Sequence, residues 1–439
     1  MRVPLQIAAL VVLNLSVSKA QSVFAHYMVG TVDATTDHAQ RDIADGITVG
    51  FDAFALNIGN STADWAKSTV DQLFAAAEGS GTKFGLFFSF DMLQHPVLAD
   101  HINLFNGYRD HPNYFRGGAN GFPVVSSYGG YAAVNDWASF KDSADIYLIP
   151  NLDDSAPRAG DSAPYYIDPA GQLSGYDVVD GFFSWESAWP ASTGGPVNVS
   201  SARDQAVMEY AHSVGKDYMM GLSSLQYKDM NGETWYRIGE ANLPQRMEQI
   251  LDLQPDFTKV ITWNDGGESH YIGNLWEEGY STAPEILEYA NMADWPHDAW
   301  QPLITSFLTA YKDGKTADQM EPPGSASDPI GAMWYRGLLK SCSENIPANV
   351  DSAVDTVNYA IVVPAGSTDL RIRVSSGGNV LSTVDARPGL NYAALPGMAV
   401  GAQKVEVLSG DETVLSATST SGVTDASRCN FNFNVVGLQ

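Results

Sequence analysis

The chain has 439 residues, a formal net charge of −27 and 44% hydrophobic residues. This length accommodates an α/β barrel of ordinary size together with a second domain of about a hundred residues. A strongly negative protein repels nucleic acids and anionic membranes, so we expect neither as a partner, and a neutral substrate is favoured. We expect the chain to act as a monomer.

The first 20 residues have the pattern of a secretion signal. Arg2 supplies the positive charge, and the apolar run from Leu5 to Val17 is too short to span a bilayer. Small residues follow at Ser18 and Ala20, where a signal peptidase cuts. The sequence therefore predicts a signal peptide over 1–20 and a secreted protein, located outside the cell or in the cell wall. Two sequons, at Asn60 and Asn198, suit glycosylation of such a protein, although sequons also arise by chance.

Residues 21–312 repeat a strand followed by a helix. Short apolar runs bounded by turn residues are typical of parallel strands that are covered on both faces. The predicted strands are Val23–Met28, Gly50–Leu56, Phe84–Phe90, Pro123–Ser127, Ile146–Pro150, Gly181–Trp185, Tyr218–Leu222 and Val260–Trp263. Amphipathic segments between them include Ala63–Glu78, Ala202–Val214 and Leu243–Leu253. The alternation predicts a (β/α)8 barrel of the TIM type over residues 21–312.

Residues 313–329 are rich in Gly, Pro and Ser and predict a linker. Beyond them, short runs of β-branched and aromatic residues alternate with turn residues, which predicts an all-β, sandwich-like domain over 330–439. The runs are Thr356–Val363, Leu370–Val374, Ala402–Val407 and Phe431–Val436. Cys342 and Cys429 are the only cysteines and most simply form one disulfide in an oxidising compartment. A catalytic thiol is disfavoured because no histidine follows His297.

A barrel carries its working groups at the carboxyl ends of its strands, so polar residues within or just after the predicted strands are the candidate site. They are His26, Tyr27, Asp52, Asp91, Tyr128, Asn151, Asp153, Asp154, Glu186, Asp265, Glu268, His270 and Tyr271. For Asp52 a buried structural hydrogen bond is an equal alternative, and Glu186 could instead close an ion pair behind the site. Trp185 and Trp189 flank Glu186 and could hold a sugar ring, although single tryptophans more often pack in a core.

The segment Trp263–Tyr271 offers two carboxylates, Asp265 and Glu268, on one loop after the last predicted strand. Hydrolysis of a glycosidic bond usually needs two such groups in different environments, one donating a proton and the other attacking or activating water. The two glycines between them let the backbone turn sharply. The alternative is a helix cap, because Asp-x-x-Glu resembles a capping box. We expect no metal and no other cofactor, since no metalloprotease-type histidine spacing occurs, and no Gly-x-Ser-x-Gly elbow indicates a serine nucleophile.

At these strand ends the sequence resembles the fungal α-1,3-glucanases, or mutanases, of glycoside hydrolase family 71. The matching stretches are Val23–Gly30 (VFAHYMVG), Asp52–Gly59 (DAFALNIG), Phe87–Met92 (FFSFDM), Asp180–Glu186 (DGFFSWE), Trp263–Asp265 (WND) and Gly267–Gly273 (GESHYIG). They occur in order along nearly the whole predicted barrel. The C-terminal region is similar, less specifically, to the accessory β-domain of that family.

The resemblance implies endo-type hydrolysis of α-1,3-glucan with inversion, Asp265 acting as general base and Glu268 as general acid. An inverting pair stands roughly 6.5–9.5 Å apart. The resemblance also implies that His26, Asp52, Asp91 and Glu186 contact substrate or support the site.

Two departures from the family pattern lie at the predicted mouth. Gly266 stands where relatives often have a larger residue, and residues 221–226 lack an expected proline and aromatics. These departures leave two alternatives open, a glucan-binding wall protein without activity and a hydrolase of another α-glucan.

Overall fold

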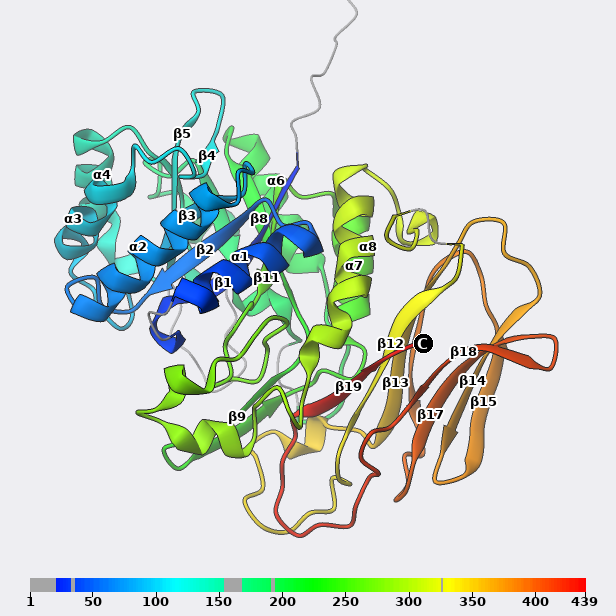
Figure 1. The fold of residues 1–439 in the computed structure, drawn as a ribbon. Coiled ribbons are helices and arrows are strands. Elements are labelled where there is room, and N and C mark those ends of the chain that lie inside the picture. The colour runs from blue at the N-terminus through cyan, green and yellow to red at the C-terminus, as the bar shows by residue number, and fades with distance from the viewer. Residues whose placement is uncertain (1–20, 33–35, 154–167, 191–193, 325–326) are drawn as a thin grey trace, which may run out of the picture.

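The computed structural model describes residues 21–32, 36–153, 168–190, 194–324 and 327–439 (Figure 1). The predicted signal peptide and Asp154 lie outside these ranges. Within them, no helix is both long and apolar enough to cross a membrane.

The first part of the chain forms a sheet with eight parallel strands. The strands are β1 Ser22–Met28, β2 Ala53–Ile58, β3 Gly85–Asp91, β5 Phe122–Tyr128, β6 Tyr147–Ile149, β7 Gly181–Ser184, β8 Asp217–Ser223 and β11 Phe257–Ile261. Each of the eight predicted apolar runs overlaps one of them, because buried parallel strands are apolar on both faces. A short strand, β4 (Arg116–Gly117), pairs antiparallel with β5.

The sheet is strongly curled. β1 lies between β2 and β11, and the parallel series runs β6-β5-β3-β2-β1-β11-β8-β7. The two terminal strands of this series approach each other, because a parallel bridge joins Asn151, just after β6, to Phe183 in β7. The backbone N–H groups of Asp180 and Phe183 also donate to the carbonyls of Leu148 and Pro150. The carboxyl ends of all eight strands therefore gather on one edge.

Helices pack around the sheet (Figure 1). They are α1 Thr36–Val49, α2 Asp64–Gly79, α3 Leu98–Tyr108, α4 Val134–Ser143, α5 Pro169–Leu173, α6 Ala202–Ser213, α7 Asn242–Leu253 and α8 Gln301–Lys312. In α2 the buried side chains Ala66, Val70, Leu73, Phe74 and Ala77 recur every three or four residues, so one face of the helix meets the core. The predicted helices at Ala63–Glu78, Ala202–Val214 and Leu243–Leu253 are confirmed as α2, α6 and α7.

A two-stranded hairpin, formed by β9 (Gln226–Met230) and β10 (Glu233–Arg237), is inserted between β8 and α7. Its turn is Asn231-Gly232, and both residues have positive φ, at 56° and 77°. This is the backbone conformation that an Asn-Gly pair adopts readily between antiparallel strands. The hairpin was not predicted from the apolar runs.

The C-terminal part contains two antiparallel four-stranded sheets that share a core. The first has the order β16-β13-β12-β19 and the second β15-β14-β17-β18. Their bounds are β12 Ile330–Arg336, β13 Thr356–Val363, β14 Leu370–Ser376, β15 Asn379–Asp385, β16 Gly389–Pro396, β17 Gln403–Ser409, β18 Glu412–Thr418 and β19 Phe433–Gly437. Buried residues from the first sheet, such as Tyr359 and Ile361, pack with Ile372 and Val405 of the second. Cys342 and Cys429 form a disulfide, as expected.

The inner C-terminal sheet also packs against the first part of the chain. Trp334 of β12 is fully buried, its ring centroid lies 5.8 Å from that of Trp300, and its indole N–H donates to the carbonyl of Glu240 at 2.9 Å. Ala317 and Met320, from the segment predicted to be a linker, are buried in the same core. One continuous hydrophobic cluster therefore extends from the parallel sheet into the C-terminal domain.

Candidate active site

The loop that follows β11 carries the two predicted catalytic carboxylates. Its two ends are held together, because the N–H of Thr262 donates to the carbonyl of His270 at 2.8 Å and that of Gly273 to Trp263 at 2.7 Å. Asn264 attaches the loop to the end of β1, since its Oδ1 accepts from the N–H of Met28 at 2.7 Å. The loop is thus a fixed part of the carboxyl edge.

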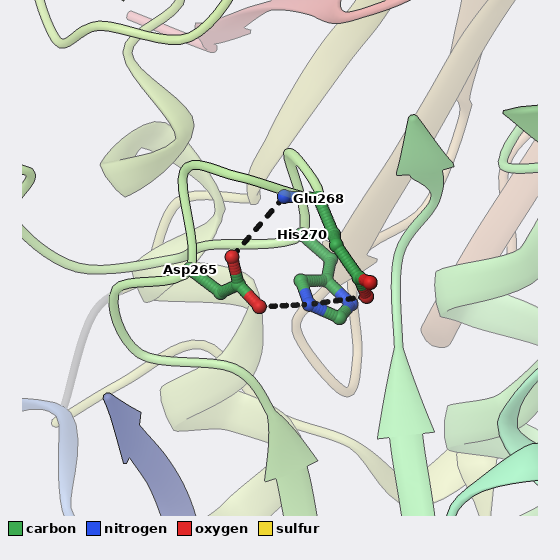
Figure 2. A group of neighbouring side chains, drawn as sticks. All are labelled: Asp265, Glu268 and His270. Atoms are coloured by element: carbon green, nitrogen blue, oxygen red, sulfur yellow. Dashed lines mark hydrogen bonds and ion pairs between the residues drawn. The ribbon is translucent and has the colours of Figure 1, made fainter. Parts of the chain in front are cut away.

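Asp265 and Glu268 face each other across this loop (Figure 2). Asp265 Oδ1 accepts from the backbone N–H of Glu268 at 3.1 Å, as a capping residue would, but turns rather than a helix follow. Its Oδ2 lies 3.1 Å from His270 Nε2, and a Glu268 carboxylate oxygen lies 3.6 Å from the same nitrogen. One oxygen of Asp265 therefore accepts a hydrogen bond as a capping residue does, while its other oxygen faces Glu268 and His270.

Gly266 and Gly267 permit this close turn. A Cβ atom at Gly266 would stand 2.8 Å from the hydroxyl of Tyr280, which accepts from the Gly266 N–H at 3.0 Å. The larger residue expected at this position from relatives would thus displace Tyr280 in this chain.

One oxygen of Asp265, one of Glu268 and one nitrogen of His270 all lie within 4.8 Å of one another. Groups of this kind can share a metal ion. Hydrogen bonds within the protein already account for the positions of these three side chains, and the expected absence of a metal stays a prediction. The spacing is also shorter than the 6.5–9.5 Å expected for an inverting pair, because both carboxylates point toward His270.

The surroundings of Glu268 favour its protonated form. Enclosure by the site and the neighbouring charge of Asp265 raise the pKa of Glu268, while His270, Gln226 and Arg237 act in the opposite direction. The side-chain amide of Gln226 donates to Glu268. Raising the pKa of a carboxyl group favours its protonated form, which is the form that a general acid needs.

Gln226 and Arg237 are functional residues that the sequence analysis missed. They are opposite each other in the β9–β10 hairpin and so lie on one face of it. Arg237 forms an ion pair with Glu186 at 2.6 Å. This was the alternative considered for Glu186. The Asn231-Gly232 turn was the signal that could have located the hairpin.

The floor of the site consists of aromatic rings from three strand ends. The ring centroid of Trp185 lies 4.8 Å from that of His26, 5.0 Å from Tyr128 and 6.0 Å from His270. Trp189 lies between His270, at 5.7 Å, and the guanidinium of Arg237, at 5.2 Å. Trp189 is 1% exposed and its ring packs against that of His270, so in this structure it presents no open face to a sugar ring.

Lys259 and His26 are buried side by side below the loop. Lys259 Nζ lies 3.1 Å from the hydroxyl of Ser89 and 4.5 Å from the ring centroid of Phe183. Burial lowers the pKa of Lys259 to about 7. Burial, followed by the charge of Lys259, lowers the pKa of His26, so His26 is neutral under most conditions.

Asp153 is buried and supports the turn that follows β7. Asp153 Oδ2 accepts from the backbone N–H groups of Trp185 at 2.6 Å and Glu186 at 2.8 Å. Burial raises its pKa to about 7, although these hydrogen bonds act in the opposite direction. Its prediction as a substrate contact is therefore corrected to a role in holding the turn that follows β7. Asn151, another strand-end candidate, donates to the same carboxylate oxygen at 2.8 Å.

Two predicted tyrosines point away from the site. Successive side chains of a strand alternate between its faces, so His26 faces inward and Tyr27 faces α1, where its hydroxyl donates to Asp42 at 2.6 Å. Tyr271 is fully buried, stacks on His297 at 4.1 Å and donates to the carbonyl of Trp295. The predictions of both as substrate contacts are wrong.

Two predicted aspartates also have structural roles. Asp52 precedes β2 and so lies at the opposite edge of the sheet, where it pairs with Lys312 at 2.8 Å and accepts from the Val23 N–H. The apolar run was interpreted as a strand beginning before Asp52, whereas the strand begins after it. Asp91 is at the correct edge, but its carboxylate accepts from the N–H groups of Leu93 and Gln94.

The chain resembles proteins of known family. A model of Glycosyl hydrolase family 71 matches residues 19–439. A mutanase of Penicillium rubens is 30% identical over 432 residues, which cover 96% of this chain and 89% of the relative. A glucan endo-1,3-alpha-glucosidase of Schizosaccharomyces pombe is 29% identical over 426 residues, covering 93% of each chain.

A solved GH99 endo-alpha-mannosidase from Bacteroides thetaiotaomicron is similar in fold, with a TM-score of 0.51 at 13% identity. The similar region covers 66% of this chain and 98% of the mannosidase. At this identity the likeness concerns the fold alone. The match of the family model from residue 19 to the last residue, together with the identity to the mutanase, shows that the chain belongs to glycosyl hydrolase family 71.

Proposed function

We propose that this chain is an endo-acting hydrolase of α-1,3-glucosidic bonds in α-1,3-glucan, with Glu268 as general acid and Asp265 as general base. The observation that carries the proposal is the pairing of these two carboxyl groups on one loop, with the pKa of Glu268 raised by enclosure and by Asp265. The names of the family 71 relatives supply the substrate class.

In the proposed reaction Glu268 gives its proton to the glycosidic oxygen as the bond to the anomeric carbon breaks. Asp265 removes a proton from the water that attacks this carbon, so the two carboxyl groups exchange protonation states. When Asp265 is ionised it can only accept hydrogen bonds, so the contact with His270 requires a proton on Nε2. His270 thereby orients Asp265. Tyr128, at the end of β5, and Trp185, just after β7, have ring centroids 5.0 Å apart and are the proposed sugar-facing aromatics.

Inversion is the proposed stereochemical course, as the family resemblance implies. One oxygen of each carboxyl group lies within 4.8 Å of the other, closer than an inverting pair stands, so we propose that Glu268 turns away from His270 when a substrate binds. The Glu268 side chain is 31% exposed and has space for this movement, whereas that of Asp265 is 12% exposed. Retention would instead make one carboxylate a nucleophile.

The surrounding architecture is proposed to follow the same family plan. The eight parallel strands would form a closed (β/α)8 barrel over 21–312, followed by a linker at 313–329 and a β-sandwich at 330–439. A signal peptide at 1–20 and glycans at Asn60 and Asn198, both of which are exposed, would fit a secreted or wall-located monomer.

The deciding experiment is proton NMR of the purified full chain acting on a soluble α-1,3-glucan, with the anomeric signals followed from the first minutes. We expect the β-anomer to appear first. First formation of the α-anomer would overturn inversion and the base role of Asp265. Asp265→Asn and Glu268→Gln should each reduce hydrolysis by at least about 10³-fold with an unchanged melting temperature, since removing either group removes proton transfer.

A chain that binds glucan without hydrolysing it is the alternative to be excluded. Its support was the unusual segment at residues 221–226. That segment contains Gln226, which donates to Glu268, so the departure adds a partner to the acid. Retention of the full chain on insoluble α-1,3-glucan without release of sugar would favour binding alone, and release from another α-glucan would favour the second alternative.

A further inference from the structure

The β9–β10 hairpin contacts Glu268 through both its backbone and a side chain. At its first residues, the Gln226 amide donates to the Glu268 carboxylate and the Tyr227 N–H donates to the Glu268 carbonyl at 2.9 Å. At its last residue, Arg237 pairs with Glu186. The open end of the hairpin therefore determines where two acidic side chains stand.

The hairpin contacts the C-terminal domain through hydrogen bonds and aromatic rings. Strand-like hydrogen bonds join its second strand to Ala348, whose N–H donates to the Thr234 carbonyl at 2.8 Å and whose carbonyl accepts from the Tyr236 N–H at 3.0 Å. The hydroxyl of Tyr227 donates to the Cys429 carbonyl at 3.4 Å, and the ring of Tyr236 meets the edge of Phe431 at 5.2 Å.

Asp229 is the polar centre of this contact. Its carboxylate accepts from Asn345 at 2.6 Å and from Arg428 at 3.2 Å, both in the C-terminal domain, and from Thr234 across the hairpin at 2.9 Å. Only 15% of the Asp229 side chain is exposed. It lies near the turn, whereas Gln226 and Arg237 lie at the other end of the hairpin.

The two C-terminal loops that contact the hairpin are linked to each other by a disulfide. The disulfide joins Cys342 in the loop after β12 to Cys429 in the segment before β19. Next to it, the N–H of Cys429 donates to the Glu344 carbonyl, and a parallel bridge pairs Glu344 with Arg428. In Figure 1 these loops, coloured yellow to orange and red, extend below the sheets toward β9.

We propose that the disulfide-linked loops of the C-terminal domain are a positioning element of the active site, which acts through Asp229 and the hairpin to place Gln226 against Glu268. The inference rests on the proposed role of Glu268 as the acid. The C-terminal domain then contributes to turnover itself, independently of any binding of polysaccharide by its outer sheet.

Small displacements of a catalytic group are costly. A shift of about 1 Å caused by a change far from the chemistry can reduce a rate by about 10²-fold. Asp229→Ala removes two hydrogen bonds between the hairpin and the C-terminal domain, and one within the hairpin, without touching Glu268 or Asp265. We expect kcat to fall about tenfold, with KM changed less than about threefold, because substrate-facing groups stay in place.

The test compares Asp229→Ala with Glu406→Ala in the full chain. Glu406 is a matched control, because its buried carboxylate also accepts three hydrogen bonds, from Arg373, Lys404 and Thr413, but in the outer C-terminal sheet. We expect Glu406→Ala to lower the melting temperature and leave kcat unchanged. Asp229→Asn, which keeps the shape and one acceptor oxygen, should restore part of the lost kcat.

Two further readouts separate positioning from simple loss of stability. Asp229→Ala should accelerate amide hydrogen exchange in residues 226–237 and 262–271, whereas Glu406→Ala should not. In a Gln226→Leu background, Asp229→Ala should reduce kcat little further, because both changes act on one contact.

If the exchange of 262–271 and kcat in Asp229→Ala match those of Glu406→Ala, the inference is overturned while the proposed function stands. If the wild-type chain proves inactive on α-1,3-glucan, the hydrogen-exchange data alone test whether the C-terminal loops position the hairpin.

Discussion

At the scale of single residues, the environment of Glu268 is a balance of opposing influences. Burial and Asp265 raise its pKa, and His270, Gln226 and Arg237 limit the rise. A general acid works best with a pKa near the working pH, since it must be protonated yet able to release its proton. Gln226 and Arg237 therefore lower the pKa of the acid, while burial and Asp265 raise it and favour the protonated form.

Gln226→Leu tests this balance. Loss of the donor removes a hydrogen bond that favours the ionised form, so the pKa of Glu268 should rise. Activity requires the protonated acid, and therefore the alkaline limb of the kcat/KM profile should move to higher pH. Gln205→Leu is the control, because Gln205 is exposed on α6 and its side-chain amide donates to Glu209 on the same helix. An alkaline limb that stays in place, or moves to lower pH, would contradict this account of Glu268.

The local part of the site could be predicted from the sequence, and the non-local part could not. Asp265, Glu268 and His270 lie within six consecutive residues, so a motif contains all three. Asp52 was misplaced because an apolar run does not mark where its strand begins. Arg237 reaches Glu186, 51 residues away, across the fold from the last residue of the hairpin. No motif in the sequence near Arg237 predicts its contact with Glu186.

At the scale of elements, apolar runs predicted the covered parallel strands and missed strands of mixed sequence, among them β12 (IGAMWYR), which is buried. All eight parallel strands are covered and were found, whereas β15 is largely exposed and has the mixed sequence NVLSTVD. An edge strand of this kind buries little, so it needs no apolar run. The helices α6 and α7 were also found. They are joined by a buried ion pair between Asp204 and Arg246, at 2.9 Å, with both side chains at 0% exposure.

Asp204→Ala should destabilise the protein severely. It leaves the Arg246 guanidinium buried without its counter-charge, while Arg246 still donates to the Gly221 carbonyl in β8. Breaking a buried pair in this way costs about 3–5 kcal/mol. The matched change is Asp37→Ala, which removes an exposed pair with Arg41 and should cost less than about 1 kcal/mol. Urea unfolding of both variants measures the two losses of unfolding free energy. Equal losses would show that the buried Asp204–Arg246 pair stabilises the protein no more than the exposed pair does.

At the scale of the whole molecule, the C-terminal domain and the parallel sheet share one hydrophobic cluster. Trp334, Phe431 and Phe433 of the C-terminal domain belong to the same buried cluster as Trp300 and Tyr236. His297 connects the two parts by polar contacts as well, since its ring nitrogens lie 3.1 Å from the Tyr271 carbonyl and 3.0 Å from that of Phe433. Large apolar interfaces of this kind prevent domains from moving or unfolding independently.

We therefore expect the full chain to unfold in a single calorimetric transition, with calorimetric and van't Hoff enthalpies in agreement if unfolding is reversible. A chain that stops at residue 329 should be insoluble or bind a hydrophobic dye, because it exposes the apolar surface that Trp334 and Phe431 cover. Differential scanning calorimetry of the full chain is the direct measurement. Two separate transitions, or a soluble and active chain ending at residue 329, would mean that the linker predicted at 313–329 joins independent domains, and that the hairpin keeps its position without the C-terminal loops.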